Sequence, residues 1–512
     1  MSQRYLLGLD VGTSGTKALL IDGAGRVKAT ANVEYPMFTP RPLWAEQKPE
    51  DWWKASAAAI RAVLKKARAK GSDVAGVGLT GQMHGLVLLD KSGKVLRPCI
   101  MWNDQRTAKQ CAAITKKVGA KRVIALTGNP VLPGFTAPKI AWVRENEPGV
   151  FRKAAKALLP KDYIRYRLTG EFFGEVSDAS GTSLFDVGRR RWSDEMLKAV
   201  GVPRAWLPEI TESPVASTRV SATAAAATGL VAGTPVVGGG GDQAAQAVGT
   251  GIVSEGAVSV TLGTSGVVFA ASDRYRVEPS GLLHAFCHAV PGKWHLMGVM
   301  LSAGGSLRWY RDALCGEEKA LAARRGCDPY EIMIAEAAKA PAGCEGLIFL
   351  PYLTGERTPH PDPLARGAFV GLTLRHGKGH LTRAVLEGVA YGLADSLTLM
   401  RELKLSVREI RASGGGARSP LWRQILADVF RAPVATVNST DGAAYGAALL
   451  AGVGTGAFKS VESAAAKAVK VTGRTGVEKK TAAVYARYYP RYRALYPALK
   501  EEFAAVSGAG EG

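Results

Sequence analysis

The sequence has few of the features that mark extracellular, metal-ribbon or membrane proteins. Its 512 residues include six cysteines, and no two of them form a C-x-x-C pair. This excludes a disulfide framework and a zinc ribbon and favours reduced thiols in a cytoplasmic protein. No uninterrupted apolar run reaches the length of a membrane span. Asp10 interrupts the apolar run from Met1 to Val11, so we expect no signal-peptide core.

Acidic residues are also few compared with basic ones. Lys and Arg total 66 against 44 Asp and Glu, which gives a net charge of +22. Such a charge favours anionic partners without selecting one. The basic runs at 65–70 and 189–191 lack interleaved aromatic residues, which favours solvated surface faces over a nucleic-acid stripe. We expect no nucleic-acid partner and no membrane partner, and the sequence leaves open a homodimer.

One four-residue motif occurs twice, half a chain apart. Gly12-Thr13-Ser14-Gly15 is repeated as Gly263-Thr264-Ser265-Gly266, and an apolar segment flanks each motif on both sides. Each copy predicts a strand, a tight loop and a second strand. Two matched hairpins predict two similar domains.

Strands and helices alternate elsewhere, which predicts an α/β fold. We expect strands at 74–79 and 86–89 and a long helix at 382–400. The domain boundary is expected near 249–257. The predicted domains are 1–250 and 251–490, followed by a tail at 491–512 that frays from about Ala504.

The two Gly-Thr-Ser-Gly loops suit phosphate binding. Their glycines allow close backbone approach, and the hydroxyl and N–H groups of Thr13, Ser14 and Thr264 can donate to phosphate oxygens. One such loop alone would be read as an ordinary turn. Neither a Walker A spacing nor a dinucleotide fingerprint is present. Duplicated strand–loop–strand clamps favour an actin-like ATPase with the nucleotide in a cleft between two related domains.

A third glycine-rich stretch, 413–419, follows a short strand pattern and precedes a helical pattern at 421–430. Its glycines, Gly415 and Gly416 among them, suit contact with a nucleotide. A tight strand-to-helix turn explains them equally well.

Two aspartates stand at positions suited to phosphoryl chemistry. Asp10 ends the first predicted strand, beside the first loop, where a carboxylate can hold Mg²⁺; a turn-initiating Asp is the alternative. Asp242 follows four glycines, 238–241, and starts a helix; the alternative to a catalytic role is that it simply caps this helix. Four glycines exceed the needs of a cap and suggest that something large lies against that turn.

A sugar site is suggested by two polar loops at strand ends. Gln82-Met83-His84-Gly85 joins two predicted strands, and Trp102-Asn103-Asp104 follows another apolar segment. An indole beside polar side chains suits a carbohydrate, although packed core residues explain Met83 and Trp102 equally simply.

A cluster of histidines, His284, His288 and His295 with Cys287, does not have the spacing of a zinc site. On a strand, His284, Phe286 and His288 would share one face while Cys287 points away.

Two longer segments resemble the signatures of the FGGY carbohydrate kinases. Residues 134–146 resemble the first signature, and 367–372 with 380–387 resemble the second. The resemblance extends from about Tyr5 to the 450s. It implies two ribonuclease-H-like, actin-like ATPase domains with an active-site cleft between them, and ATP-dependent phosphorylation of a sugar.

Within the family, the stretches 44–47, 52–53, 81–85, 159–163 and 349–360 resemble the members that phosphorylate D-xylulose at its 5-hydroxyl. The resemblance implies the following roles: Asp242 as catalytic base, Asp10 near Mg²⁺ and phosphate, Met83 and His84 at the sugar, Gly12, Thr13, Ser14 and Thr264 at phosphates, and Gly304, Arg308, Gly415 and Gly416 near ATP. One departure is the residue after Asp242. Many of these members have Asn there, whereas this sequence has Gln243, as do the members that act on glycerol. This puts in doubt the substrate, but not the fold or the reaction.

Two rival functions stay open. The nearest is another kinase of the family, acting on ribulose, glycerol or gluconate. A more distant one is an actin-like or chaperone-like ATPase that binds protein partners and needs no sugar pocket.

Overall fold

The chain folds into two compact units whose segments interleave along the sequence. The computed structural model describes residues 5–438 and 442–509. Unit 1 takes the described parts of 1–254, 271–295 and 439–470, and unit 2 those of 255–270, 296–438 and 471–512. Each unit therefore draws on both halves of the chain, whereas the sequence predicts two consecutive domains.

The main sheet of unit 1 begins with the predicted hairpin. Strands β1 (Tyr5–Val11) and β2 (Gly15–Asp22) pair antiparallel, and β3 (Val27–Glu34) continues the meander. On the other side of β1, β5 (Val74–Gly81) runs parallel to it, and β14 (Pro235–Val236) and β15 (Gly240–Gly241) run parallel to β5. The carboxyl ends of β1, β5 and β15 therefore meet at one edge.

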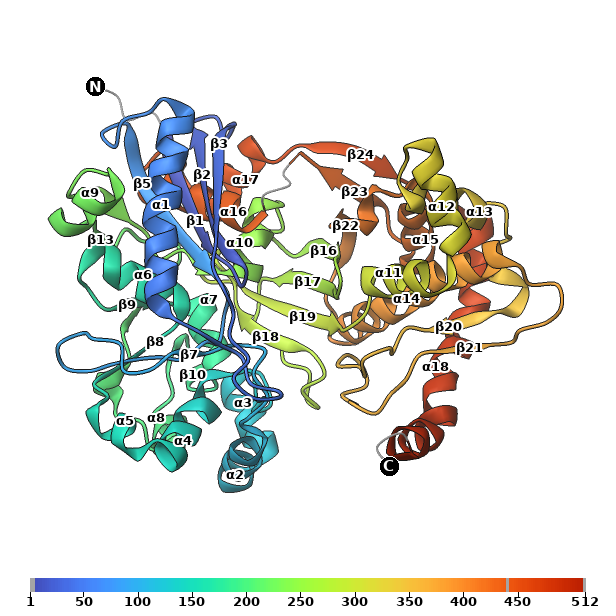
Figure 1. Ribbon diagram of the computed structural model, residues 1–512, viewed down its shortest axis with the longest axis horizontal. Coiled ribbons are helices and arrows are strands. Elements are labelled where there is room, and N and C mark those ends of the chain that lie inside the picture. The colour runs from blue at the N-terminus through green and yellow to red at the C-terminus, as the bar shows by residue number, and fades with distance from the viewer. Residues whose placement is uncertain (1–4, 439–441, 510–512) are drawn as a thin grey trace. The chain divides into compact units, whose positions relative to one another are not determined.

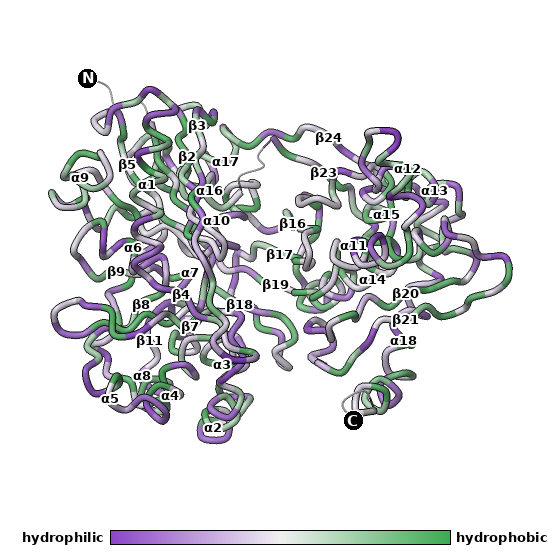
Figure 2. Tube along the Cα trace, viewed as in Figure 1, coloured by the Kyte–Doolittle hydropathy of each residue, from purple (hydrophilic) through white to green (hydrophobic). Residues whose placement is uncertain are grey.

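Side chains of this sheet alternate between two hydrophobic clusters, as the pleat of a strand requires. Leu7, Leu9 and Leu20 pack with Trp52 and Ile60 of α1 (Pro49–Ala67). The intervening Leu6, Leu19 and Ile21 pack instead in a cluster with residues of α16 (Gly442–Gly454) and α17 (Val461–Ala468). The sheet is thus a middle layer between helices, and Figure 2 shows hydrophobic residues, in green, along its strands.

Helix α16 joins unit 1 from the C-terminal part of the sequence. Figure 1 shows it in orange beside the blue strands β1 and β2. The contact is too close for side chains: a Cβ on Gly8 would lie 1.9 Å from the carbonyl oxygen of Ala444, and one on Gly78 would lie 1.9 Å from that of Ala447. Glycines in the strands therefore let the helix backbone lie directly on the sheet.

The remaining elements of unit 1 surround this core, apart from Thr218–Arg219, which pairs antiparallel with β14 at the edge of the main sheet. They are β4 (Glu46–Gln47), β6 (Val87–Leu89), β7 (Cys99–Ile100), α2 (Ala108–Val118), α3 (Ala120–Thr127), α4 (Thr136–Asn146), α5 (Pro148–Lys153), β8 (Lys156–Leu158), α6 (Pro160–Thr169), β9 (Phe173–Glu175), α7 (Val176–Ala179), β10 (Phe185–Asp186), β11 (Arg191–Trp192), α8 (Asp194–Val200), β12 (Glu209–Thr211), β13 (Thr218–Arg219), α9 (Ala222–Thr228), α10 (Asp242–Gly249) and β18 (His284–Cys287). The predicted strands at 74–79 and 86–89 are confirmed by β5 and β6.

Unit 2 repeats the strand pattern of unit 1. Strands β16 (Gly256–Leu262) and β17 (Gly266–Ser272) form the second predicted hairpin, and β22 (Val407–Ser413) runs parallel to β16 as β5 does to β1. Its sheet also includes β19 (Trp294–Met300), β23 (Val434–Val437) and β24 (Val471–Thr475). The predicted α/β fold with two similar domains is confirmed.

The helices of unit 2 are α11 (Gly304–Leu314), α12 (Gly316–Arg325), α13 (Pro329–Ala337), α14 (Lys378–Glu402), α15 (Pro420–Phe430) and α18 (Lys479–Ala509), with a small sheet of β20 (Ile348–Leu350) and β21 (Ala368–Val370). Helix α14 confirms the long helix predicted at 382–400. The predicted tail at 491–512 differs: its described residues continue α18 as far as Ala509. Tyr492, Tyr496 and Phe503 are buried there, so apolar packing stabilises the helix up to about Ala504, the point from which we expected the tail to fray.

Two further observations concern the cysteines and the possibility of a membrane span. All six cysteines are free, and five of them are buried. Among the helices of the described chain, none combines the length and the apolar character that a membrane span needs.

The contact between α16 and the sheet can be tested with a single methyl group. Gly78→Ala places a Cβ against the backbone of Ala447, and backbone cannot move aside as a side chain can. We expect a loss of about 3 kcal/mol in the free energy of unfolding, the upper end for overpacking, measured by urea denaturation. The matched control is Gly23→Ala, whose Cβ would meet nothing within 4 Å. Equal stability of the two variants would contradict this packing.

Candidate functional site

Three neighbouring strand ends bring the predicted catalytic residues of unit 1 together. In the register of the sheet, Asp10 on β1 lies opposite Thr80 on β5, and Gly241 on β15 lies opposite Gly81. Asp242 follows Gly241 directly. Ligands of open α/β sheets bind at the carboxyl ends of parallel strands, so this edge is the candidate site.

The glycine run before Asp242 is explained by the protein's own backbone. A Cβ on Gly239, whose φ is +75°, would lie 1.8 Å from the carbonyl oxygen of Leu79, and one on Gly238 would lie 2.6 Å from that of Glu212. A Cβ on Gly241 would lie 2.8 Å from the sulfur of Met83. The large group that we expected against this turn is therefore strand β5 and its following loop.

Asp242 is the first residue of α10 and does not cap it, because Gly241 holds the N-cap position. Its Oδ1 accepts a hydrogen bond from the N–H of Gln243 at 2.7 Å. Asp242 thus lies near the N-cap, as expected, but does not act as the cap, and its second carboxylate oxygen keeps acceptor capacity for a ligand.

Both carboxylates are only partly exposed, and their protonation is shifted accordingly. Desolvation by the surrounding protein raises the pKa of Asp242 to about 6. Desolvation also raises the pKa of Asp10 to about 7; the negative charge of Asp242 adds to this rise, and the charge of Lys17 opposes it. Two mutually repelling carboxylates in one polar niche form an arrangement typical of functional sites.

The loop after β5 holds His84 in a strained backbone conformation. Its φ is +70°, which is uncommon for any residue other than glycine. The imidazole stacks on Phe135 at 4.5 Å, and Nδ1 lies 2.7 Å from the carbonyl oxygen of Gly181. A Cβ on Gly181 would lie 2.4 Å from this ring, so glycine is needed there.

Two residues of the first signature segment hold the backbone of His84. The carbonyl oxygen of His84 accepts hydrogen bonds from Thr136 Oγ1 at 3.1 Å and from Lys139 Nζ at 2.9 Å. Lys139 also donates to the carbonyl oxygen of Gly134 at 2.6 Å. It is fully buried, and desolvation lowers its pKa to about 7. These residues stabilise the strained loop rather than facing a ligand.

A buried hydrogen-bond chain supports the start of α10. The N–H of Gly241 donates to Ser177 Oγ at 3.1 Å, and Ser177 Oγ donates to Glu175 Oε1 at 2.9 Å. Glu175 Oε2 also accepts from Ser213 Oγ at 3.0 Å. Residues 175–181 therefore link the backbone before Asp242 to the ring of His84.

A buried lysine, Lys161, lies beside Glu175 of this hydrogen-bond network. Lys161 Nζ lies 2.5 Å from Asp162 Oδ1, 3.6 Å from Asp178 Oδ2 and 3.9 Å from Glu175 Oε1. Burial lowers the pKa of Lys161, but these three carboxylates outweigh burial and raise it above its ordinary value. The Leu-Pro-Lys-Asp-Tyr stretch at 159–163 thus supplies the charge that keeps the acidic cluster folded.

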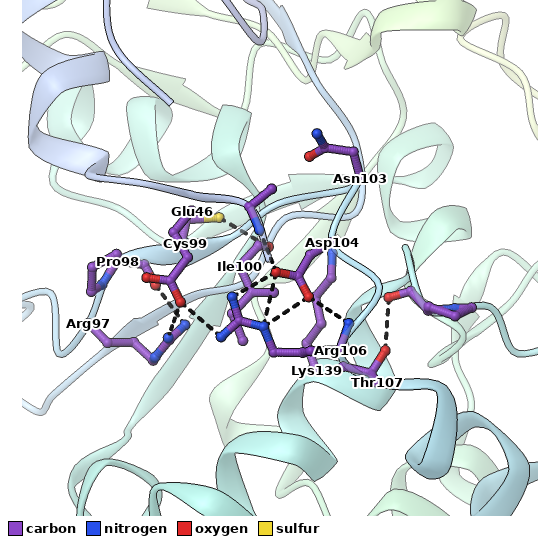
Figure 3. A network of polar contacts seen from close by, with 12 residues as sticks. Glu46, Arg97, Pro98, Cys99, Ile100, Asn103, Asp104, Arg106, Thr107 and Lys139 are labelled. Carbon is purple, nitrogen blue, oxygen red and sulfur yellow. Dashed lines mark hydrogen bonds and ion pairs between the residues drawn. The ribbon is translucent and has the colours of Figure 1, made fainter. Parts of the chain in front are cut away.

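The residues predicted to contact sugar after β7, Trp102, Asn103 and Asp104, have different surroundings. Figure 3 shows the side chain of Asn103 pointing away from Asp104 and Arg106. Trp102 is 42% exposed, and Asn103 Oδ1 is buried without accepting a hydrogen bond from any described residue. An orphan acceptor beside an exposed indole fits a sugar hydroxyl.

Asp104 has a different place from the one predicted. It is fully buried, and its oxygens accept from the N–H of Ala45 at 2.7 Å and from the guanidinium of Arg106 at 2.7–3.0 Å. Arg106 in turn lies 2.9 Å from Glu46 and 3.6 Å from the ring of Trp44. Asp104 therefore fixes the loop that carries Trp102, and the prediction that it contacts sugar is corrected.

The first Gly-Thr-Ser-Gly loop lies beside these residues. The N–H of Gly12 donates to the carbonyl oxygen of Gly15 at 3.0 Å, which closes the turn. Ser14 is exposed, whereas the hydroxyl of Thr13 bonds inward to Gln82.

Unit 2 contains a separate cavity of about 950 Å³. All the residues that we predicted near ATP in this unit line it: Thr264, Gly304, Arg308, Gly415 and Gly416. Arg308 Nη2 donates to Thr264 Oγ1 at 3.3 Å, and the N–H of Gly304 donates to the carbonyl oxygen of Gly263 at 2.8 Å. A Cβ on Gly415 would meet nothing within 4 Å, so this backbone is open to a ligand.

The cavity also has an apolar wall that we did not predict. Tyr330, Ile334 and Ala338 of the α13 region line one side, and Leu421 and Trp422 of α15 line another. Apolar walls with a few polar groups are typical of nucleotide pockets. Ordinary amphipathic helix spacing carries no signal that could have distinguished these residues from core positions.

The histidine group has structural partners. His284 Nδ1 lies 2.9 Å from Asn129 Oδ1, and His288 Nε2 lies 2.9 Å from the carbonyl oxygen of Ile252. His284 stacks on Phe286 at 5.5 Å, so the expected shared strand face is confirmed for this pair.

Comparison with known proteins assigns the family. Residues 5–249 match the N-terminal domain of the FGGY family of carbohydrate kinases, and residues 258–455 match its C-terminal domain. The chain therefore belongs to the FGGY family of carbohydrate kinases, whose members use ATP as a substrate.

Three individual proteins are similar to this chain over most of their length. The chain is 43% identical over 500 residues to the xylulose kinase of Escherichia coli (strain K12), which covers 96% of this chain and 99% of that protein. A crystal structure of a "xyloylose kinase" from Brucella ovis is 41% identical with a TM-score of 0.88, covering 97% and 99% of the two chains. The gluconokinase of Bacillus subtilis (strain 168) is 33% identical over 461 residues, or 90% and 89% of the two proteins.

The raised pKa values predict how stability changes with pH. A carboxyl group whose folded pKa exceeds its unfolded value binds its proton more tightly when folded, and this stabilisation is lost as pH rises through the folded pKa. Asp10→Asn and Asp242→Asn remove the charge that the fold resists. We expect each variant to exceed the parent's stability at pH 8 by about 1–3 kcal/mol, and the difference to shrink towards pH 4.5.

Thermal unfolding at the two pH values checks this expectation. Asp194→Asn, on the exposed first turn of α8, is the control and should show no comparable gain. A parent more stable than both site variants at pH 8 would contradict the desolvated carboxylate pair.

Proposed function

We propose that this protein phosphorylates D-xylulose at its 5-hydroxyl with ATP, giving D-xylulose 5-phosphate and ADP, and that it serves pentose catabolism. The observation that carries the proposal is the meeting of Asp242, Asp10 and the Met83-His84 loop at one strand edge. The likeness to xylulose kinases over almost the whole chain supports the choice of substrate.

The sugar is proposed to bind against His84, Met83, Trp102 and Asn103. The exposed indole offers a flat apolar face, and the orphan Oδ1 of Asn103 can accept from a sugar hydroxyl. The imidazole of His84 is held by Phe135 and Gly181, so little side-chain freedom is lost on binding. Gln243, next to Asp242, is proposed to complete this wall.

Asp242 is proposed to be the general base. Phosphoryl transfer proceeds through a loose transition state that needs little nucleophilic push. The carboxylate therefore holds the 5-hydroxyl in line and accepts its proton late, as the bond to phosphorus forms. A pKa of about 6 makes Asp242 a stronger proton acceptor than an ordinary carboxylate while leaving it ionised at neutral pH.

Asp10 is proposed to hold Mg²⁺ or its water ligands. Its partly exposed carboxylate, beside a second carboxylate and next to the Gly12–Gly15 loop, is a donor set that fits a divalent cation. When bound, the ion supplies positive charge to the phosphate oxygens. Ser14 is proposed to donate to the same oxygens, and Gly12, whose N–H already bonds to Gly15, is proposed to allow their close approach.

The cavity of unit 2 is proposed to bind ATP. Its apolar wall suits the adenine ring, and Thr264, Arg308 and the open backbone at Gly415 suit the phosphates. We place the enzyme in the cytoplasm, where reducing conditions match its free cysteines. A homodimer stays a prediction that analytical ultracentrifugation would check.

A second candidate is gluconate phosphorylation by the same groups. It is favoured by the likeness to a gluconokinase. Gln243, which members that act on glycerol have after the base, weakens the choice of D-xylulose without favouring gluconate. The residues proposed for catalysis would be unchanged, and only the wall at 102–103 would contact a different sugar.

The role of Asp242 can be tested by an isosteric change. Asp242→Asn keeps the size of the side chain and its hydrogen-bond acceptor but removes the base. We expect kcat with D-xylulose to fall about 10²–10⁴-fold, while the affinity for ATP holds and the melting temperature does not fall. Coupled detection of ADP measures this. A folded variant that turns over within a few-fold of the parent would disprove the mechanism, and Asp194→Asn should match the parent.

The sugar site can be tested by removing the imidazole. His84→Ala should lower kcat/KM for D-xylulose by about 5–150-fold, equivalent to about 1–3 kcal/mol for an unpaired hydrogen-bonding group, with nucleotide affinity unchanged. A substrate panel of D-xylulose, ribulose, gluconate and glycerol measures the change and the preference of the parent. His376→Ala, in a loop of unit 2, is the control. Equal kinetics of His84→Ala and the parent on every sugar would place the sugar elsewhere.

A further inference from the structure

A ring of hydrogen bonds joins the first phosphate loop to the loops on either side of it. Thr13 Oγ1 donates to Gln82 Oε1 at 3.0 Å, Gln82 Nε2 donates to Gln47 Oε1 at 3.0 Å, and Gln47 Nε2 donates to the carbonyl oxygen of Thr13 at 2.7 Å. The indole N–H of Trp102 donates to Thr13 Oγ1 at 3.0 Å. Thr13 is therefore the point where the proposed sugar wall meets the phosphate loop.

The ring uses the hydrogen-bonding capacity of the Thr13 hydroxyl in a defined way. A hydroxyl has one proton to donate, and here it goes to Gln82. An indole N–H can only donate, so Trp102 takes an acceptor position of the same oxygen. The proton of Thr13 is thus directed into the protein, and the exposed Ser14 is left as the loop's outward hydroxyl. The expected contact between the Thr13 side chain and phosphate does not match this arrangement.

The glutamines of the ring are buried, whereas the indole attached to it is exposed. Gln47 is 1% exposed and Gln82 is 3% exposed, and Gln47 Oε1 also accepts from the indole of the buried Trp52 at 3.0 Å. Trp102, by contrast, is 42% exposed. A ligand that packs on Trp102 restricts the one member of the network that solvent leaves free to move.

We propose that the Thr13 hydroxyl is a positioning group that couples sugar binding to ATP binding. The proposal rests on the function proposed above. A sugar packed against Trp102 fixes the indole, the indole fixes Thr13, and Thr13 fixes the Gly12–Gly15 loop in the conformation that receives phosphate. The ordering that the second ligand would otherwise require is then already complete, which makes the two ligands bind cooperatively.

A coupling role for Thr13 explains sequence features that direct contact with a substrate does not explain. Gln47, Trp52 and Gln82 are each at most 3% exposed, which leaves no surface for a ligand. In the ring they serve as the anchor that makes the position of Thr13 depend on Trp102.

A double-mutant cycle tests the coupling. Trp102→Phe keeps an aromatic face and removes the N–H, and Thr13→Val keeps the shape and removes the hydroxyl. The affinity for a non-hydrolysable ATP analogue is measured by calorimetry with and without D-xylulose. We expect the sugar to tighten nucleotide binding by about five- to tenfold in the parent. Each variant should lose most of this effect, and the double variant should lose no more than either alone.

The controls separate coupling from general damage. Thr13→Ser keeps the hydroxyl and should retain the coupling, and Trp206→Phe changes a partly exposed tryptophan that packs on Phe151 and should match the parent. Melting temperatures establish that each variant is folded.

Three outcomes would overturn the inference. Thr13→Val could weaken nucleotide binding equally with and without sugar, which would make Thr13 a phosphate ligand. The losses in the two single variants could multiply in the double variant, or the parent could show no effect of sugar on nucleotide affinity. Failure of the proposed function is a different result: the parent would then not phosphorylate D-xylulose at all.

Discussion

The site depends on an electrostatically unfavourable arrangement, two carboxylates held close together with little water around them. The charge of Asp242 helps to raise the pKa of Asp10 towards 7, and desolvation acts on both groups. Side chains free to move would separate. They stay together because each belongs to the end of a strand that pairs with β5, Asp10 on β1 and Asp242 directly after β15. The backbone of the sheet opposes the repulsion of the charges.

The residues around this pair support it indirectly, through its neighbours. Ser177 and Glu175 hold the N–H of Gly241, Thr136 and Lys139 hold the carbonyl oxygen of His84, and Asp104 holds the loop of Trp102. Each support is buried and uses charged or polar groups that would destabilise the fold if left unpaired. This division explains why long stretches of the chain resemble the family although few residues can touch a substrate.

Local features were predictable from the sequence, and long-range partners were not. Both Gly-Thr-Ser-Gly hairpins and the strand-to-helix turn at 413–419 follow from glycine and apolar spacing within a few residues. The burial of Asp104 depends on the N–H of Ala45, 59 positions away, and nothing near Asp104 distinguishes it from a carboxylate that faces a ligand. The glycines at 238–241 correctly indicated a close neighbour, but its identity was not predictable, because Leu79 of β5 and Glu212, which press on them, lie far from them in the sequence. The continuation of α18 beyond residue 491 was also missed, because its three buried aromatic residues, Tyr492, Tyr496 and Phe503, have packing partners that local spacing does not reveal.

The position of α16 has a consequence for the order in which the protein folds. The ribosome makes β1, β2 and β5 first, but the helix that covers one face of their sheet starts only at Gly442. Until that helix emerges, the cluster that contains Leu6, Leu19 and Ile21 lacks the residues that α16 and α17 supply to it in the finished protein. Most of unit 2 is synthesised in the interval. Unit 1 is thus completed only after most of unit 2, whose last segment, 471–512, follows it. A chain cut at the boundary near residue 250 would lack the helix that lies against Gly8 and Gly78.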